Sequence, residues 1–128
     1  EGIYIHKRNG FYYLFASVGS CCEGLKSTYT TVVGRSDNLF GPYGDKQGRP
    51  MMENQHEVLI QKNHKFVGTG HNSEIVKDQK DQDWVVYHAV SVDNPKGRVL
   101  MMDKVSWENG WPVVKGKSPS LESDKPVL

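Results

Sequence analysis

The chain opens with EGIYIHKRNGFYYLF (residues 1–15), in which two short runs of strand-forming side chains flank Asn9-Gly10. The first run alternates apolar side chains with polar or aromatic ones at a period of two, and the second run is aromatic. Asn-Gly between two such runs is the strongest short-range signal for a β-hairpin. The stretch therefore predicts a strand, a two-residue turn and a second, buried strand over Phe11–Val18.

The same period of two continues along the rest of the chain. Residues 27–35 and 57–61 complete a first group of four predicted strands. A second group of four is predicted at residues 73–77, 84–90, 98–107 and 111–114. Because no apolar stripe at helical spacing is sustained anywhere, the pattern predicts an all-β protein. Two successive groups of four short strands fit propeller blades as well as they fit a sandwich.

Composition limits the kind of partner that the protein can have. The 128 residues include 16 Lys and Arg against 15 Asp and Glu, which gives a formal net charge of +1. A nucleic-acid-binding surface needs a clustered excess of basic side chains, which this balance does not supply. No apolar run approaches the roughly 20 residues that cross a bilayer. We therefore expect neither a nucleic acid nor a membrane as a partner.

The only two cysteines, Cys21 and Cys22, are adjacent in the sequence. Neighbouring cysteines cannot link distant segments, and a bond between them needs strained geometry. A vicinal pair could bind a soft metal, but no further ligands at zinc-like spacing lie nearby. We expect a structural pair in a bend between a strand and a loop, and the redox compartment stays undetermined.

Several short motifs together resemble a known enzyme family. In chain order they are Glu1-Gly2-Ile3-Tyr4-Ile5, residues 12–17, Cys21-Cys22-Glu23-Gly24, Ser27-Thr28-Tyr29, Gly34-Arg35-Ser36, Gly41-Pro42-Tyr43, residues 68–72, Tyr87-His88 and residues 107–112. They resemble the last two blades of family 43 glycoside hydrolases, specifically the endo-acting arabinanases, over nearly the whole chain. The resemblance implies a five-bladed β-propeller, of which this chain supplies about the last two four-stranded blades.

The resemblance also suggests how the chain is divided. Residues 1–63 correspond to the fourth blade, residues 64–118 to the fifth, and residues 119–128 to a tail. A domain rarely begins on its own active-site strand, so we expect the remaining blades of a longer protein to be partners of this chain. Two blades cut from a ring expose apolar faces that normally press on their neighbours.

For the chemistry, the resemblance implies hydrolysis of α-1,5-linked L-arabinan with inversion, by three carboxylates: an Asp base, an Asp that tunes the acid, and a Glu acid. Only the acid has a counterpart here, and it is Glu1. A glutamate is almost entirely ionised at neutral pH unless burial or a neighbouring negative charge raises its pKa. Because the base and the tuning Asp are missing, we expect the 128-residue chain alone to be inactive. Without the resemblance, Glu1 would be interpreted as a solvated terminal residue.

His71 is the second candidate site residue. The resemblance implies that its ring approaches a cation, usually calcium, at the centre of the propeller, where water supplies most of the other ligands. One imidazole is a poor anchor for a hard cation that prefers six to eight oxygens. Thr69 stands where the family pattern has Pro. Because threonine restricts the backbone less than proline does, the backbone angle at this position is less firmly fixed. Taken alone, His71 would be a surface or hydrogen-bonded side chain, and His88 a strand residue whose polar tip is satisfied internally.

Three further residues are predicted to contact the substrate, arabinan or an arabino-oligosaccharide. Cys22 and Ser27 lie in the loop that overhangs the cleft beside the acid in this fold. Arg98 begins a predicted strand near the mouth of the cleft, where it could donate a hydrogen bond to a sugar hydroxyl. The plainer interpretation of Arg98 is a charge at the end of a strand.

Two other interpretations of the chain stay open. One is a non-catalytic carbohydrate-binding or structural β domain, in which Glu1 and His71 are incidental. The other is a family relative that acts on a different pentose, such as a β-xylosidase or an exo-acting arabinofuranosidase. The resemblance further implies a secreted or periplasmic protein.

Overall fold

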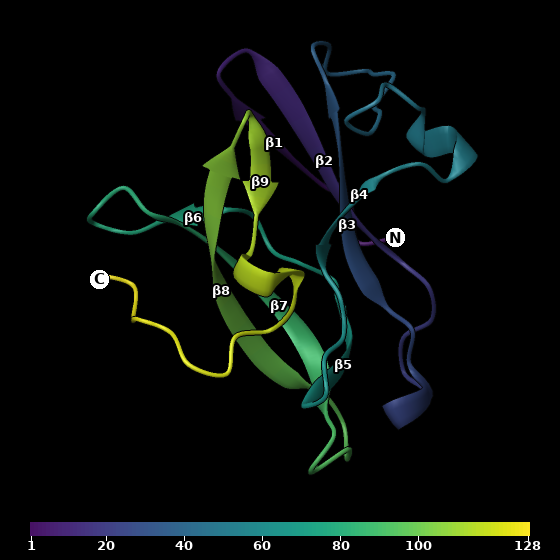
Figure 1. Cartoon of the computed structure of the whole chain (residues 1–128), viewed down its shortest axis with the longest axis vertical. Coiled ribbons are helices and arrows are strands. Elements are labelled where there is room, and N and C mark those ends of the chain that lie inside the picture. The colour runs from purple at the N-terminus through teal and green to yellow at the C-terminus, as the bar shows by residue number, and fades with distance from the viewer.

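In the computed structural model, which describes all of residues 1–128, the chain forms two β-sheets that pack against each other (Figure 1). Sheet A contains β1 (Tyr4–Arg8), β2 (Phe11–Val18), β3 (Thr30–Ser36) and β4 (Glu57–Ile60). These strands lie in the order of the sequence, and each pairs antiparallel with the next.

The hairpin predicted at the start of the chain is confirmed. Arg8 pairs with Phe11 across the turn, and both turn residues, Asn9 (φ 50°) and Gly10 (φ 81°), have positive φ. Two-residue turns of this kind match the right-handed twist of the strands, which is why Asn-Gly is favoured there. β2 has the predicted bounds, Phe11–Val18.

Sheet B contains β5 (Phe66–Gly70), β7 (Asp83–Ser91), β8 (Val99–Glu108) and β9 (Trp111–Val113) in that order. The short strand β6 (Val76–Lys77) pairs with the first residues of β7, whereas β5 pairs with its last residues. The edge of sheet B beside β7 is therefore formed by two short strands, with residues 71–75 between them.

The first strand of sheet B corrects the sequence prediction. It was expected at residues 73–77, but the strand is β5, and only β6 falls within the expected range. Gly68 and Gly70 conceal β5 because glycine is depleted in strands. Both glycines face close neighbours: a Cβ at Gly70 would overlap the Tyr29 ring, and a Cβ at Gly68 would lie 2.8 Å from that of Ser27. Gly68 and Gly70, which make β5 difficult to predict from the sequence, are therefore the residues that allow Ser27 and Tyr29 to approach it.

The core lies between the two sheets. Its buried side chains come from both sheets and the connections next to them: Tyr13, Phe15, Val33, Leu59, Ile60, Ile75, Val85, Tyr87, Val105, Trp111 and Val114. Two buried threonines also link the sheets: the Thr31 hydroxyl donates to the Thr69 carbonyl at 3.3 Å, and the Thr69 hydroxyl donates to the Ile60 carbonyl at 3.0 Å. The sheets are thus held together by apolar burial and by satisfied polar groups.

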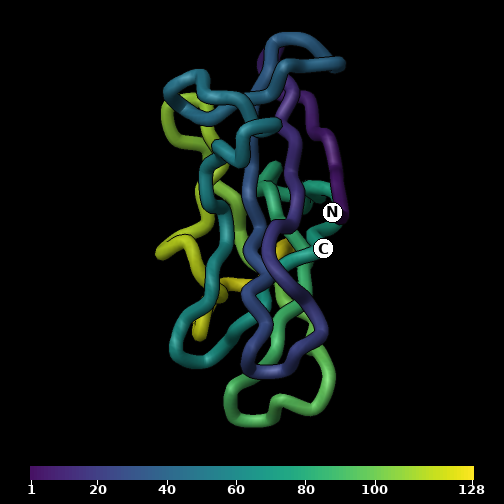
Figure 2. The backbone as a smooth tube through the Cα atoms, turned by 90° about the vertical axis from the view of Figure 1, so that its right-hand side faces the viewer, coloured from purple at the N-terminus to yellow at the C-terminus, as the bar shows by residue number.

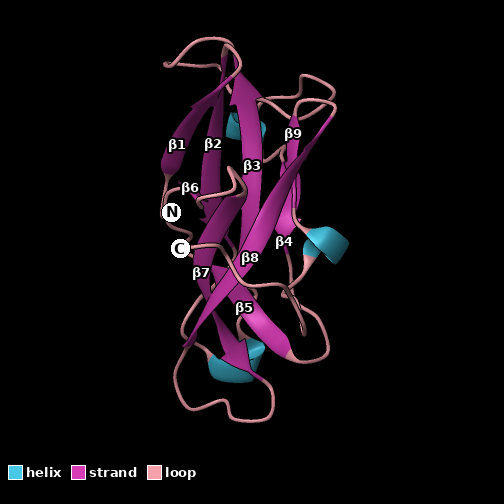
Figure 3. Cartoon of the chain, turned by 90° about the vertical axis from the view of Figure 1, so that its left-hand side faces the viewer, coloured by secondary structure: helices cyan, strands magenta, loops and turns pink.

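Helical structure is limited to three single turns, η1 (Gly24–Lys26), η2 (Met51–Glu53) and η3 (Lys115–Lys117). Figure 3 shows them in the connections between strands and after the last one. None of these helices has the length and apolar character that a membrane crossing requires.

Two of the longer connections lie at one end of the molecule. Residues 19–28, which include η1, and residues 92–98, which join β7 to β8, lie at the same end in both Figure 1 and Figure 2. The turns at Asn9-Gly10 and Asn109-Gly110 lie at the opposite end (Figure 1). The N-terminal residue lies along the edge of sheet A between these two ends.

Candidate active site

Glu1 is held in place by its backbone. Its carbonyl oxygen accepts a hydrogen bond from the Ser17 N–H at 2.8 Å, and its backbone nitrogen donates to the Ser17 carbonyl at 2.8 Å. These bonds continue the pairing of β1 with β2 beyond the last pair of the ladder, Tyr4 with Phe15. The Glu1 side chain reaches a buried partner, because its Oε1 accepts a hydrogen bond from the Tyr29 hydroxyl at 2.9 Å. Glu1 is exposed, but this hydrogen bond orients its carboxylate.

Tyr29 is the residue around which the site is assembled. It is only 1% exposed, and its hydroxyl lies 3.5 Å from Nδ1 of His71 as well as 2.9 Å from Glu1. The Tyr29 ring stacks against the ring of His88, with the centroids 6.2 Å apart and an interplanar angle of 16°. Sequence reasoning missed Tyr29, because a tyrosine at the start of a strand carries no local mark that it meets a residue 28 positions earlier.

His71 approaches Glu1 from the end of β5. Its backbone has φ 54°, and its N–H donates to the Ser17 hydroxyl at 2.7 Å. The imidazole lies against the backbone next to Glu1, since a Cβ at Gly2 would be 3.3 Å from Cγ of His71. The structure thus brings together the two residues that the sequence singled out separately, with Tyr29 between them.

His88 differs from its sequence interpretation. Nε2 of His88 lies 3.3 Å from Nη1 of Arg98. Because a guanidinium can only donate, Nε2 accepts and the ring proton is on Nδ1. Nδ1 is buried and has no hydrogen-bond partner, so the expectation of an internally satisfied polar tip is wrong for this atom. Burial lowers the pKa of His88, and the charges of Arg98 and His71 act in the same direction, which favours the neutral ring.

The protonation of Tyr29 fixes the direction of its hydrogen bond. Burial raises the pKa of the Tyr29 phenol, and the Glu1 carboxylate adds to this effect, whereas the Ser17 hydroxyl and the charge of Arg98 act in the opposite direction. The phenol therefore keeps its proton at neutral pH. A carboxylate can only accept, so the bond runs from Tyr29 to Glu1.

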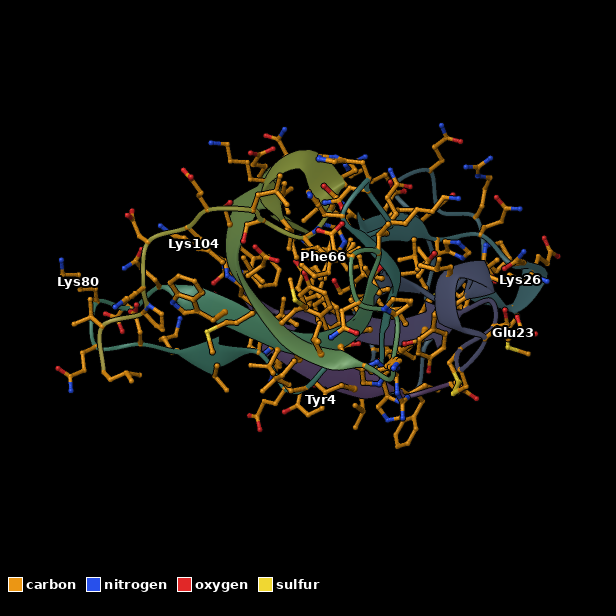
Figure 4. The ribbon with its side chains drawn as sticks, turned by 90° about the horizontal axis from the view of Figure 1, so that it is seen from below. Tyr4, Glu23, Lys26, Phe66, Lys80 and Lys104 are labelled. Atoms are coloured by element: carbon orange, nitrogen blue, oxygen red, sulfur yellow. A yellow bond between two sulfur atoms is a disulfide. The ribbon has the colours of Figure 1, made fainter.

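The loop of residues 19–28 leads directly into Tyr29. Ser20 closes it, since its carbonyl accepts hydrogen bonds from the N–H groups of Thr28 at 3.0 Å and Tyr29 at 2.9 Å. Cys21 and Cys22 form a disulfide within this loop. Figure 4 shows the loop, labelled at Glu23 and Lys26, at the edge of the molecule opposite Lys80.

The three predicted substrate-binding residues are not alike in the structure. Ser27 is 4% exposed, and its hydroxyl accepts a hydrogen bond from the Glu23 N–H at 3.0 Å, so it closes the loop. Cys22 and Arg98 are exposed and line an open pocket of about 250 Å³ between the loop of residues 19–28 and the β7–β8 turn. Its remaining lining residues are Gly24, Val90, Pro95 and Gly97. A sugar contact at any of the three stays a prediction.

The residues of this chain do not by themselves fit a calcium site. A hard cation takes six to eight oxygen ligands, whereas His71 offers a nitrogen. No group of three or more His, Cys, Asp or Glu side chains is placed to hold a metal ion. A cation near His71 stays a prediction, and it would need water or residues outside this chain as its other ligands.

Comparison with known proteins identifies the family of the chain. Residues 1–112 match glycosyl hydrolases family 43. An extracellular exo-α-(1→5)-L-arabinofuranosidase, ArbA of Cellvibrio japonicus, is 42% identical over 118 residues, which cover 91% of this chain and 33% of that protein. The extracellular endo-α-(1→5)-L-arabinanase 1 of Bacillus subtilis is 34% identical over 105 residues, which cover 82% of this chain and 31% of that protein.

Solved structures agree with the sequence relatives. The α-L-arabinanase of Cellvibrio cellulosa, solved in complex with arabinohexaose, superimposes with a TM-score of 0.84 at 41% identity and covers 91% of this chain and 37% of that one. The chain thus spans about a third of the length of the curated relatives it matches. Its fold is that of the arabinanases, a five-bladed β-propeller, and its two sheets correspond to about two blades. This chain therefore belongs to glycosyl hydrolases family 43.

Proposed function

We propose that the protein carrying this chain is an inverting glycoside hydrolase that cleaves α-1,5-linked arabinan, with Glu1 as the general acid. The observation that carries the proposal is the Glu1 carboxylate, which accepts a hydrogen bond from the buried Tyr29 hydroxyl beside His71. The relatives support the substrate, because those with 42% and 34% identity are named for exo and endo action on α-(1→5)-linked arabinose polymers.

In this mechanism Glu1 gives its proton to the glycosidic oxygen of the departing sugar. An inverting enzyme also needs an ionised carboxylate about 6.5–9.5 Å from the acid, so that a water molecule fits between that base and the sugar. We propose that this base, and a second Asp that raises the proton affinity of the acid, come from other blades. The 128-residue chain alone is then inactive.

Uncovered apolar side chains support the presence of neighbouring blades. Leu100 and Met102 of β8 are 79% and 41% exposed. They alternate with the buried Asp103 and Val105, so they lie on the face of sheet B that points away from the core. We propose that another blade of the same protein covers this face. Linear arabinan offered to the 128-residue chain, and to the protein with its remaining blades, tests this: turnover by the chain alone would refute the proposal.

The products of the reaction distinguish endo action from exo action. Endo action releases a series of arabino-oligosaccharides early in the reaction, whereas exo action releases one short product from the chain end. We propose the endo mode, on the resemblance of the motifs around Cys21-Cys22 and Ser27-Thr28-Tyr29. Exo action is supported by the 42% identity to ArbA. Early product analysis on linear arabinan distinguishes the two, and turnover of β-xylosides in place of arabinan would favour a β-xylosidase.

The stereochemistry of the first product provides an independent test. Proton NMR during hydrolysis reports the anomeric configuration before mutarotation. Release of the inverted β-arabinose end supports the mechanism, and a retained α end would exclude it. Binding of arabinan without turnover, unchanged by Glu1→Gln, would instead indicate a non-catalytic carbohydrate-binding domain.

Two further roles belong to the same proposal. Cys22 and Arg98 flank a pocket at the end of the molecule that carries the loop of residues 19–28, and we propose that a sugar unit contacts them there. The relatives from Cellvibrio japonicus and Bacillus subtilis are named as extracellular enzymes, and we propose that this protein is also secreted or periplasmic.

A further inference from the structure

We propose that Tyr29 is a positioning residue that directs the proton of Glu1 to one carboxylate oxygen and stabilises the carboxylate that remains after proton transfer. This inference rests on the proposed role of Glu1 as the general acid. It assigns a function to a buried residue that enters the sequence predictions only as part of the Ser27-Thr28-Tyr29 motif, with no role of its own.

The Tyr29 hydrogen bond distinguishes the two oxygens of the Glu1 carboxylate. Oε1 of Glu1 accepts the hydrogen bond from the Tyr29 hydroxyl at 2.9 Å. When Glu1 is protonated, that bond is stronger with the acidic proton on the other oxygen, Oε2, because Oε1 is then a carbonyl oxygen, which accepts better than a hydroxyl oxygen of the acid. No side chain or backbone group of this chain donates to Oε2 at hydrogen-bond distance, so Oε2 is the oxygen left to face a leaving group. The alternative acceptor of the phenol, Nδ1 of His71, is farther away, at 3.5 Å.

The Tyr29 hydroxyl, which donates this hydrogen bond, is rigidly held. Tyr29 is 1% exposed, its ring lies directly over Gly70, and the same ring stacks against the ring of His88. Its backbone N–H is bonded to the Ser20 carbonyl at 2.9 Å. A hydrogen-bond donor held in this way is already oriented toward the position where charge develops, and needs no reorganisation during the reaction.

The hydrogen bond from Tyr29 to Glu1 changes in strength during catalysis. The O–H bond at Oε2 of Glu1 breaks, a new O–H bond forms on the departing sugar oxygen, and the electron pair stays on the carboxylate. The Tyr29 bond to Oε1 thereby changes from a neutral to a charge-assisted hydrogen bond, which is roughly twice as strong. Because the bond strengthens as the transition state is approached, it raises kcat more than it lowers KM.

The experiment removes only the hydroxyl, with Tyr29→Phe in the protein that includes the remaining blades. On linear arabinan we expect kcat to fall about tenfold with KM within about twofold, as the loss of one charge-assisted bond predicts. An arabino-oligosaccharide with a dinitrophenolate leaving group needs little protonation, and on this substrate we expect a loss of less than about twofold.

Tyr13→Phe is the matched control. Tyr13 is also 1% exposed, and its hydroxyl donates one hydrogen bond, to the Gly110 carbonyl at 2.6 Å, at the other end of the molecule. A purely structural effect lowers the rates on both substrates equally, and this is the result expected for any loss caused by Tyr13→Phe. Should Tyr29→Phe fail to fold, a fluorinated tyrosine introduced at position 29 keeps the ring and grades the acidity of the hydroxyl.

The outcomes separate this inference from the proposed function. Equal losses on both substrates, or no loss on either, with Glu1→Gln inactive on arabinan, would overturn the role of Tyr29 and leave the function intact. Activity of Glu1→Gln on arabinan would overturn the proposed function itself. A loss confined to the substrate with the poor leaving group supports the role of Tyr29.

Discussion

Glu1 and Asp78 are two carboxylates of this chain with opposite surroundings. Asp78, at the β6–β7 turn, accepts hydrogen bonds from the Lys80 N–H at 2.9 Å, the Gln82 N–H at 2.9 Å, the Gln82 side-chain amide at 3.3 Å, the Trp84 indole at 3.0 Å and the Val127 N–H at 3.1 Å. Glu1 accepts one hydrogen bond on its side chain, from Tyr29. Both oxygens of the Asp78 carboxylate accept hydrogen bonds, whereas Oε2 of Glu1 has no hydrogen-bond partner in this chain.

The difference lies between a carboxylate fixed by many donors and the carboxylate of Glu1, the proposed general acid, which accepts from one side chain. Burial tends to raise the pKa of Asp78, but its N–H donors outweigh burial and lower that pKa from 3.8 to about 2. Asp78 is therefore an anion at neutral pH, and it ties the β6–β7 turn to the C-terminal tail. There the Gln79 N–H also donates to the Val127 carbonyl at 2.8 Å. A carboxylate with a free oxygen can gain and lose a proton, which is what an acid catalyst requires.

The largest effect is expected from Glu1→Gln. Glutamine has the same shape and can still accept the Tyr29 hydrogen bond, but it has no proton to donate. We expect kcat/KM on arabinan to fall about hundred- to ten-thousand-fold, while the free energy of unfolding changes by no more than about 0.5 kcal/mol because Glu1 is exposed. Kinetics and thermal unfolding measure both. A variant that kept its activity would remove the contrast with Asp78.

The converse variant is Asp78→Ala, which leaves five N–H groups without their acceptor. We expect the midpoint of thermal unfolding to fall by about 5 °C, with kcat on arabinan unchanged because Asp78 lies away from Glu1 at the β6–β7 turn. Hydrogen exchange at the Val127 amide should accelerate as the tail is released. An unchanged midpoint would show that the tail contributes nothing to stability.

The pH dependence of stability sharpens the same contrast. Asp78 binds its proton more weakly in the folded protein than in the unfolded chain, so its stabilising contribution is complete above about pH 4. That contribution is lost as the pH falls from 3.8 through about 2. The difference in unfolding midpoint between the wild type and Asp78→Asn should therefore be constant at neutral pH and shrink across this window. A difference that persisted at pH 2 would contradict the assignment.

The smallest effect is expected at His88. Arg98→Ala removes one of the two charges that hold the pKa of His88 below its ordinary value, so that pKa should rise while burial and His71 continue to depress it. NMR titration of the His88 ring measures the change. Lys96→Ala, which removes a charge from the same exposed turn, is the control and should leave the titration unchanged. No rise in Arg98→Ala would show that the Arg98 contact is not maintained in solution.

Sheet A was predictable because its signals are local. Asn9-Gly10 specifies a turn, and the aromatic and β-branched runs on either side of residues 19–28 specify strands. Sheet B was less predictable from its sequence, because Gly68 and Gly70 lie within β5 and glycine has a poor strand propensity. Glycine is needed there because Ser27 and Tyr29 approach the strand closely. His88 and Tyr29 were missed as site residues for the same reason, since their importance depends on neighbours that lie far away in the sequence.

What the amino-acid sequence determined by itself is the all-β class, the hairpin at the start of the chain, and the candidacy of Glu1 and His71 through the family motifs. Local alternation and turn chemistry act over a few residues, so they can be read without coordinates. Only the tertiary structure decided that Tyr29 meets Glu1, that His71 and His88 stack with ring centroids 5.9 Å apart, and that Ser27 is turned inward. Contacts between residues tens of positions apart depend on which strands pair and how the sheets pack, which no local pattern records.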